Sequence, residues 1–426
     1  MELIGEEEIQ EVLEVLRGGY LFRYGISLGA DVDPRFKGKV YEVERAVADY
    51  CGVRYAVAVN SGTSALLTAL CGLGVGPGDE VIVPGYTFIA SISSIIYARA
   101  IPVLAEVDRT FNLDPADVRA KITPRTRAIL AVHMMGNPAR LAELKAIADE
   151  HGLLLIEDAA QAFGASYKGR PVGSIGHAGA FSFNVYKTIT SGDGGMVVTD
   201  DENVYRRCFA FHDQGHSPLR TGVEIGRRPF VGLDFRFTEL QAAVLLPQLR
   251  KLPRILSHLR ANKARFKERI AGLPGLEFRE LPDPDGDLAT MLTVILPTEE
   301  LARRIAGELG TKVVADAGWH VYSNMEQILE QRTITPEQCP FTCSPYTGRG
   351  GQMRYWKGML PQTDALLARS INIGIGVSDP GLGSAFGVTM RDGLEEVEER
   401  AARFREVAGR HLTGRHPAAA GRGAER

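Results

Sequence analysis

Short apolar runs alternate with amphipathic stretches through much of the first 250 residues. Five runs are typical of strands: YAVAV (55–59), EVIVP (80–84), AILAVH (128–133), LLLIED (153–158) and GMVVTD (195–200). Buried strands of a parallel sheet are apolar without interruption, as these are. Apolar residues at helical spacing follow the first two runs, at 64–74 and 88–98. The alternation predicts an α/β fold in which crossover helices connect the strands of a parallel sheet.

The segments on either side of this region follow other patterns. Residues 1–50 are predicted to form helices joined by a loop, and the first helix begins near Glu6. A long helical stretch at 238–273 contains Pro247 and Pro253, where we expect the helix to bend.

The C-terminal third mixes one strand, ATMLTVILP (289–297), with helices at 298–309 and 392–408. We therefore predict four parts: an N-terminal helical segment (1–25), a large α/β domain (26–255), a small α+β domain (256–410) and a tail (411–426). The tail is rich in Gly, Ala and Arg, a composition typical of disordered segments.

The charge and the apolar content of the chain disfavour several classes of protein. The chain has 426 residues, with 49 basic and 52 acidic side chains and a formal net charge of −3. This near balance does not favour binding to nucleic acid or to a membrane surface. The N-terminus lacks the basic and apolar regions of a signal peptide, and no apolar run approaches the ~20 residues that span a bilayer. We expect a cytoplasmic enzyme with more than one domain.

The cysteine and histidine positions do not predict a metal site. The chain has five cysteines and no CxxC pair. Cys339 and Cys343 share a CxxxC spacing without a matching Cys or His cluster, so we expect ordinary thiols. His212 and His216 lack a third ligand at metal spacing, and we assign them to a loop on the substrate side.

Several polar segments follow predicted strands, at the edge where open α/β sheets bind ligands. The first is the run from Ser61 to Ser64, which includes Gly62 and Thr63 and lies between a strand and a helix. Free backbone N–H groups and the helix dipole at such a place suit a phosphate group. The same residues are also typical of an ordinary helix N-cap, so this segment alone leaves both interpretations open.

The strand LLLIED ends in two carboxylates. Burying the last of them, Asp158, costs free energy unless it has a partner, and a protonated heterocycle nitrogen such as that of pyridoxal phosphate is one. A helix cap or a salt bridge is the alternative. Glu157 is expected to point to the opposite face of the strand and to have a structural role.

The segment FSFNVYKTITSGDGG (181–195) places Lys187 among aromatic residues. Burial lowers the pKa of an amine and favours a nucleophilic lysine, although most lysines are solvated surface charges. Ser182 is a candidate phosphate ligand. Phe88, just after another strand, is placed either to stack on a planar ring or to fill the core.

These segments, in this order, resemble the DegT/DnrJ/EryC1/StrS sugar aminotransferases, which are fold-type I pyridoxal-phosphate enzymes. The matching segments are NSGTSAL, GDEVIVPGYTFIAS, EDAAQAFGA, FSFNVYKTITSGDGG and FRFTELQAAVLLPQL. The resemblance is strong over residues 5–250 and looser to about 405. It implies a mostly parallel, seven-stranded central sheet sandwiched by helices, in a large domain that binds the cofactor.

The resemblance also implies roles for single residues. Lys187 forms the internal aldimine with pyridoxal 5′-phosphate, and Asp158 pairs with its pyridinium nitrogen. Gln161 lies near the phenolic oxygen of the cofactor, and Phe88 stacks on its ring. The phosphate is held by Gly62, Thr63 and Ser182.

One position departs from the family pattern. The family often has an Asn before TELQAA that reaches the phosphate of the neighbouring subunit's cofactor, and this chain has Asp234 there. An anion facing a phosphate is repelled unless a proton or a cation intervenes. Arg236 or a shifted loop would compensate, so we do not transfer the role to Asp234.

The C-terminal half resembles the branch that contains the 8-amino-3,8-dideoxy-manno-octulosonate transaminases, in which the amino acceptor is a free keto or aldehyde sugar. The matching segments are DAGWHVYSNMEQIL (316–329), CPFTCSPY (339–346), YWKGMLPQTDALLARSINIGIGVSD (355–379) and, near the N-terminus, YLFRYG (20–25). The resemblance implies that Arg23, Tyr24, His320 and Tyr322 bind the substrate. For His320, an ordinary surface or core histidine is the alternative.

We therefore expect a pyridoxal-phosphate-dependent aminotransferase of amino-sugar biosynthesis, for an antibiotic or a surface glycan. It would transfer an amino group from glutamate or glutamine to a keto or aldehyde sugar. The alternatives are a dehydratase of the same fold, since some relatives carry histidine in place of Lys187, and a non-catalytic regulatory relative. The long apolar helical run after FRFTELQAA, together with the resemblance, predicts a homodimer with shared active sites.

Overall fold

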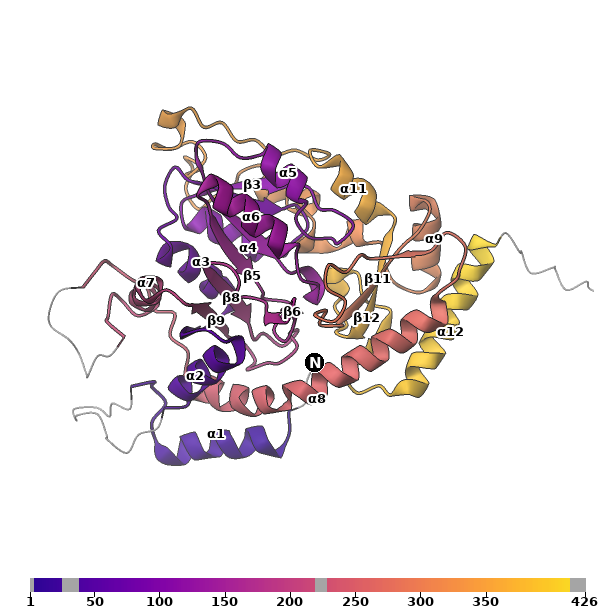
Figure 1. Cartoon of the computed structure of the whole chain (residues 1–426), viewed down its shortest axis with the longest axis horizontal. Helices are drawn as coiled ribbons and strands as arrows, with labels where there is room; N and C mark the ends of the chain where they lie inside the picture. Colours follow the sequence, from indigo (N-terminus) through magenta and orange to yellow (C-terminus); the bar gives the residue numbers. More distant parts are fainter. Residues whose placement is uncertain (1–3, 25–37, 219–227, 414–426) are drawn as a thin grey trace, which may run out of the picture.

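The computed structural model describes residues 4–24, 38–218 and 228–413 of the chain (Figure 1). The predicted tail lies outside the described residues from position 414 onward, so its predicted disorder stays a prediction. None of the described helices is both long and apolar enough to cross a bilayer.

Within the described residues, seven strands form the central sheet. They are β1 (Tyr55–Val59), β2 (Glu80–Pro84), β3 (Ile101–Ala105), β4 (Thr126–Val132), β5 (Leu154–Asp158), β8 (Ala178–Ser182) and β9 (Gly195–Thr199). Their order in space is β1-β9-β8-β5-β4-β2-β3, and β9 is the one strand of this sheet that runs antiparallel to its neighbours. The predicted α/β fold with a mostly parallel sheet is confirmed. Between β5 and β8, β6 (Ser166–Tyr167) and β7 (Arg170–Pro171) form a small hairpin.

The five strands expected from apolar runs are all present, whereas β3 and β8 were not predicted. The apolar run of β3 begins four residues after a helix ends, so in the sequence it continues the apolar pattern of that helix. Strand β8 has the sequence AGAFS, in which small residues have little preference for strands. Pairing with β5 and β9 makes this segment a strand.

Helices cover both faces of the sheet. One face carries α3 (Gly62–Gly72), α4 (Ile89–Tyr97) and α7 (Glu202–His212); the other carries α2 (Lys39–Cys51), α5 (Pro115–Ala120), α6 (Leu141–His151) and the first half of α8 (Glu239–Ile270). Successive strand residues point to opposite faces. Accordingly Leu155 belongs to the core on the α6 side, and its neighbour Ile156 belongs to the core on the α3 side.

Helix α8 connects the two halves of the molecule. It is one continuous helix that contains both Pro247 and Pro253, and it runs from α1 (Glu6–Gly18) and α2 to α12 (Leu394–Leu412) (Figure 1). Its residue Leu259 still packs in the core beside the central sheet, whereas Phe266 packs in the core of the C-terminal lobe. The predicted domain boundary at 255/256 therefore falls inside a single helix.

The C-terminal lobe is built on a four-stranded sheet. Its elements are β10 (Glu277–Phe278), β11 (Met291–Ile295), β12 (Ser370–Gly376), β13 (Gly387–Thr389), α9 (Glu299–Glu308), α12 and the end of α8. The segment 322–360, with α10 (Glu326–Leu329), does not pack in this lobe. Its residues Tyr322, Phe341 and Leu360 belong to the core on the α3 side of the central sheet. Part of the predicted small domain thus covers the large one, and α11 (Pro361–Ala368) leads back to β12.

Candidate active site

A cavity of about 670 Å³ lies at the carboxyl ends of the parallel strands. Val132 ends β4, Asp158 ends β5 and Ser182 ends β8, and all three line the cavity. The opposite wall comes from the C-terminal half, including η3 (Gly318–His320) and the loop after β12. The site therefore combines the two halves of the chain, at the place where open α/β sheets bind ligands.

Asp158 is a buried carboxylate that lines this cavity. Its Oδ2 accepts a hydrogen bond of 2.6 Å from the hydroxyl of Ser91, and its Oδ1 accepts one of 3.1 Å from the backbone N–H of Ala160. Burial raises the pKa of Asp158, while these two hydrogen bonds and the amine of Lys187 oppose the rise. A cation placed against this carboxylate would offset its cost of burial.

Lys187 is a half-buried amine in the same cavity. It lies in a turn in which its backbone N–H donates to the carbonyl of Asn184 over 2.9 Å. Burial lowers the pKa of Lys187, and the carboxylates of Asp158 and Asp379 partly oppose this. The neutral amine, which is the nucleophilic form, is thereby favoured at a lower pH than in water.

The N-terminus of α3 also lines the cavity. Ser61 caps the helix, because its hydroxyl accepts a hydrogen bond of 3.1 Å from the N–H of Ser64. A Cβ at Gly62 would lie 2.6 Å from the Cβ of Ser182, so only glycine lets the helix end approach β8 this closely. The approach brings the first N–H groups of α3, Thr63 and the Ser182 hydroxyl to one place, which suits an anion.

Two further predicted residues line the cavity. The side-chain oxygen of Gln161 accepts a hydrogen bond of 2.8 Å from the N–H of Met135, a residue in the left-handed region at φ 54°. The ring of Phe88 lies 5.2 Å from the ring of His320. The Nδ1 of His320 lies 3.0 Å from the carbonyl oxygen of Gly381, an acceptor, so Nδ1 carries the proton.

Glu157 lies on the other face of β5, as predicted from the alternation of strand side chains. It accepts hydrogen bonds from the backbone N–H groups of Gly173, Ile175 and Gly176 at 2.6–2.7 Å. Its Oε2 also lies 3.0 Å from Nε2 of His133. These partners lower the pKa of Glu157 despite its burial. Glu157 is therefore structural, and its neighbour Asp158 faces the cavity.

Three of the residues implied to bind substrate do not line the cavity. Arg23 is buried in an ion pair with Glu44 at 3.0 Å, and its guanidinium also lies 3.1 Å from Nε2 of His212. Because that cation and burial lower the pKa of His212 to about 3, this histidine is neutral and holds Arg23 in the core. Arg23 does not line the cavity of its own chain, and its contact with the substrate stays a prediction.

The hydroxyls of Tyr24 and Tyr322 form hydrogen bonds with residues outside the cavity lining. The Tyr24 hydroxyl donates to Asp213, and its side chain is buried. The Tyr322 hydroxyl donates to Asp364 over 2.8 Å and accepts from the backbone N–H of Leu360 over 3.2 Å. Both hydroxyls form hydrogen bonds within the chain, so the contact of Tyr24 and Tyr322 with the substrate stays a prediction. Neither residue lines the cavity.

The unusual Asp234 is paired within its own chain. Arg236 forms ion pairs with Asp234 and, at 2.7 Å, with the buried Asp213. Arg236 therefore supplies the cation that the sequence suggested as one form of compensation. Of the two histidines assigned to a substrate-side loop, His212 packs against Arg23 and His216 is buried, and both lie outside the cavity lining.

The cavity also contains residues that the sequence did not single out. Ser91 holds Asp158, Asp379 adds a second carboxylate near Lys187, and the indole of Trp319 is 63% exposed at the cavity. Tyr186 is likewise exposed beside Lys187. Asp379 follows β12, a strand that the sequence did not predict, so its place after a strand did not point to it.

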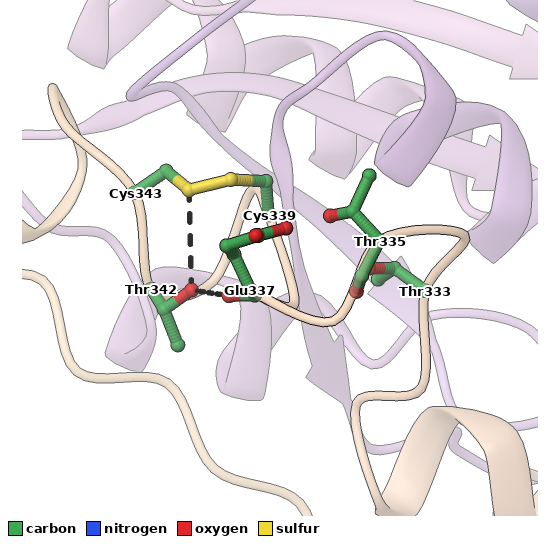
Figure 2. The surroundings of a disulfide bond; sticks show 6 residues. All are labelled: Thr333, Thr335, Glu337, Cys339, Thr342 and Cys343. Carbon is green, nitrogen blue, oxygen red and sulfur yellow. Dashed lines mark hydrogen bonds between the residues drawn. A yellow bond between two sulfur atoms is a disulfide. The ribbon is translucent and has the colours of Figure 1, made fainter.

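Outside the cavity, Cys339 and Cys343 are joined in a disulfide, with their Cα atoms 5.3 Å apart (Figure 2). The expectation of two ordinary thiols is wrong, because the turn between them brings the Cα atoms within disulfide reach. Thr342, whose hydroxyl donates to the carbonyl of Glu337, closes the same turn. Within residues 4–24, 38–218 and 228–413, no group of three or more His, Cys, Asp or Glu side chains is arranged to hold a metal ion.

The family is established by comparison with known proteins. The model of the DegT/DnrJ/EryC1/StrS aminotransferase family matches residues 2–348, so the chain belongs to this family, as its motifs implied. The solved structure of S. venezuelae DesV in complex with a ketimine intermediate is similar, with a TM-score of 0.70 and 32% identity over 94% of each chain. The fold is that of the type I aminotransferases, as expected.

Curated relatives cover a smaller part of the chain. GDP-perosamine synthase of Caulobacter vibrioides is 46% identical over 234 residues, which are 55% of this chain and 60% of that protein. The L-glutamine:2-deoxy-scyllo-inosose aminotransferase of Streptoalloteichus tenebrarius is 40% identical over 281 residues, which are 62% of this chain and 66% of that protein. The matched segments thus span less than two thirds of either relative.

Proposed function

We propose that the chain is a pyridoxal 5′-phosphate-dependent aminotransferase that transfers the amino group of glutamate or glutamine to a keto or aldehyde sugar. The proposal rests on one observation, the presence in a single cavity of an amine with a lowered pKa, Lys187, and a buried carboxylate, Asp158. Membership of an aminotransferase family supports it.

The lining fits the cofactor in three ways. Asp158 suits a protonated ring nitrogen, Lys187 suits an aldehyde carbon, and the α3 N-terminus with Gly62 and Ser182 suits a phosphate. Phe88 would cover the ring. When bound, pyridoxal 5′-phosphate supplies an electron sink for the pair of electrons left at the donor carbon after its proton is removed.

The residues of the chain would then handle protons and orientation. Lys187, whose pKa burial lowers, would accept the proton from the donor α-carbon and return it at the neighbouring position, as general base and then acid. Asp158 keeps a proton on the ring nitrogen. Ser91 orients the carboxylate, and Gln161, whose side-chain oxygen accepts from the N–H of Met135, would face the phenolic oxygen of the cofactor.

The acceptor is proposed to be a free keto or aldehyde sugar, as in the octulosonate transaminase branch that the C-terminal half resembles. Since Nδ1 of His320 carries its proton, Nε2 is an acceptor for a sugar hydroxyl. The exposed indole of Trp319 offers an apolar face for the C–H side of a sugar ring. We also propose a cytoplasmic homodimer with shared sites, in which Arg236 offsets the charge of Asp234.

The test is to incubate the holoenzyme with glutamate or glutamine and a panel of keto and aldehyde sugars, and to follow products by mass spectrometry. Replacement of a carbonyl oxygen by an amine is the expected result. Loss of water without nitrogen transfer would instead identify the dehydratase alternative. No change in any sugar, with the cofactor bound, would favour the non-catalytic alternative.

A further inference from the structure

The wall of the cavity opposite the central sheet carries one carboxylate that the proposed mechanism does not use. Asp379 lies three residues beyond the end of β12 and caps η6 (Pro380–Leu382), because its Oδ1 accepts the N–H of Gly381 over 2.7 Å. The N–H of Asp379 donates to the hydroxyl of Ser384 over 3.0 Å. Since a carboxylate accepts about four hydrogen bonds in total, Asp379 keeps free capacity toward the cavity.

This wall is held rigidly. The carbonyl of Gly381 accepts the hydrogen bond from Nδ1 of His320, and the carbonyl of Leu382 accepts one of 2.8 Å from the amide of Asn372. Asn372 lies inside β12, so the loop is tied both to η3 and to the sheet of the C-terminal lobe. The side chain of Asp379 is itself bonded to this loop, through the N–H of Gly381.

The charged groups of the described lining are mostly acidic. They are Asp158, Asp193 and Asp379 against the single cation Lys187. His320 adds no charge at neutral pH, because burial lowers its pKa to about 4. Asp158 is assigned to the cofactor, and Asp193 is exposed with its side chain next to Asn184. Asp379 is thus the carboxylate that a substrate would contact.

We propose that Asp379 selects glutamine over glutamate as the amino donor, an inference that rests on the proposed function. Glutamine is neutral overall, and its side-chain amide donates hydrogen bonds that Asp379 accepts. Glutamate carries an additional carboxylate, which the carboxylate of Asp379 repels. The donor and the sugar occupy the cavity in turn, so the same group also favours sugar hydroxyls on this wall.

The experiment measures the donor half-reaction of the holoenzyme by stopped-flow absorbance, without any sugar present. For the native chain we expect kcat/KM for glutamine to exceed that for glutamate by at least about tenfold. In Asp379→Asn the amide still caps η6, so the fold is retained. Its preference for glutamine should fall by about tenfold, mainly because glutamate reacts faster.

A matched control is Asp316→Asn. Asp316 also belongs to the C-terminal half, pairs with Arg303 at 2.8 Å and lies outside the cavity lining, so this variant removes the same charge elsewhere. Its donor preference should be unchanged. Because repulsion is screened by salt, the reaction of glutamate with the native chain should also accelerate as ionic strength rises, and that acceleration should be smaller in Asp379→Asn.

Two results would overturn this inference while leaving the proposed function intact. They are a native preference for glutamate, or an unchanged glutamine-to-glutamate ratio in Asp379→Asn, each with sugar amination still observed. If neither amino acid reacts with the holoenzyme and no sugar is aminated, the proposed function fails and this inference fails with it. Equal melting temperatures for the native chain and both variants confirm that the comparison concerns folded protein.

Discussion

The hydroxyl of Ser91, on α4, donates a hydrogen bond of 2.6 Å to Oδ2 of Asp158, at the end of β5. The hydroxyl of Thr87 lies 2.6 Å from that of Ser91, which completes a short relay of buried hydroxyls. Burial raises the pKa of Asp158, and the hydrogen bond from Ser91 is among the interactions that oppose the rise. The relay also fixes the direction in which the carboxylate points.

Asp158→Asn should leave the cofactor bound but slow the reaction by several orders of magnitude, because an amide does not hold a proton on the ring nitrogen. Single-turnover kinetics with the amino donor would measure the effect. An unchanged kcat would remove Asp158 from the mechanism.

The same variant should stabilise the apoprotein at neutral pH. The folded pKa of Asp158 is raised, so the folded state binds a proton more tightly, and ionisation destabilises it as pH rises above the ordinary carboxyl range. The stability gain of Asp158→Asn should shrink as pH falls below that range. Urea denaturation of the two apoproteins across pH measures it, and a loss of stability at pH 7 would contradict the assignment.

Lys187→Ala should abolish turnover while leaving the fold intact, since the side chain points into a cavity rather than the core. After borohydride treatment and denaturation, the native chain should keep a cofactor-sized mass on the peptide that contains Lys187, and the variant should not. Circular dichroism gives the control for folding. A variant that transaminated at the native rate would show that the lysine is wrongly assigned.

Glu157→Gln should destabilise the fold by about 3 kcal/mol at neutral pH, because three backbone donors and His133 lose a buried anionic acceptor. The folded pKa of Glu157 is lowered, so its contribution is present above the ordinary carboxyl pKa and is lost as pH falls through the folded pKa. Denaturant titration at two pH values tests both statements. A free energy of unfolding within about 0.5 kcal/mol of native would argue against this role.

Trp319→Ala should raise KM for the sugar acceptor by about three- to tenfold through loss of an aromatic contact, with little change in the donor half-reaction. Trp356→Ala is the matched control, because Trp356 is 58% exposed and lies outside the cavity lining. Separate kinetics of the two half-reactions make the comparison. Equal effects of the two substitutions would place the sugar elsewhere.

The proposed homodimer can be tested by complementation. If each copy contributes its 230–240 segment to the other's phosphate site, mixing Lys187→Ala with Arg236→Ala should restore activity, since one of the two sites then carries neither substitution. Light scattering should give about twice the chain mass of 46.3 kDa. Full activity at the mass of a single chain would contradict shared sites.

The sequence by itself determined most of the central sheet and several residues at its edge. Apolar runs gave five strands at nearly the observed bounds, because a strand buried on both faces needs apolar side chains at every position. The period of two placed Glu157 and Asp158 on opposite faces. The α3 N-terminus was found because it follows a predicted strand, and Lys187 was singled out by the aromatic residues that surround it in the sequence.

Only the tertiary structure decided which residues form the opposite wall of the cavity and which of the predicted site residues lie outside it. Trp319 and Asp379 reach it because the C-terminal half folds back over the sheet, and no local period encodes that approach. Arg23 is buried by its pairing with Glu44 and His212. The sequence did not indicate this burial, because these partners are 21 and 189 residues away in the chain. Side-chain alternation is a property of neighbouring residues, whereas the pairing of buried charges depends on how distant elements pack.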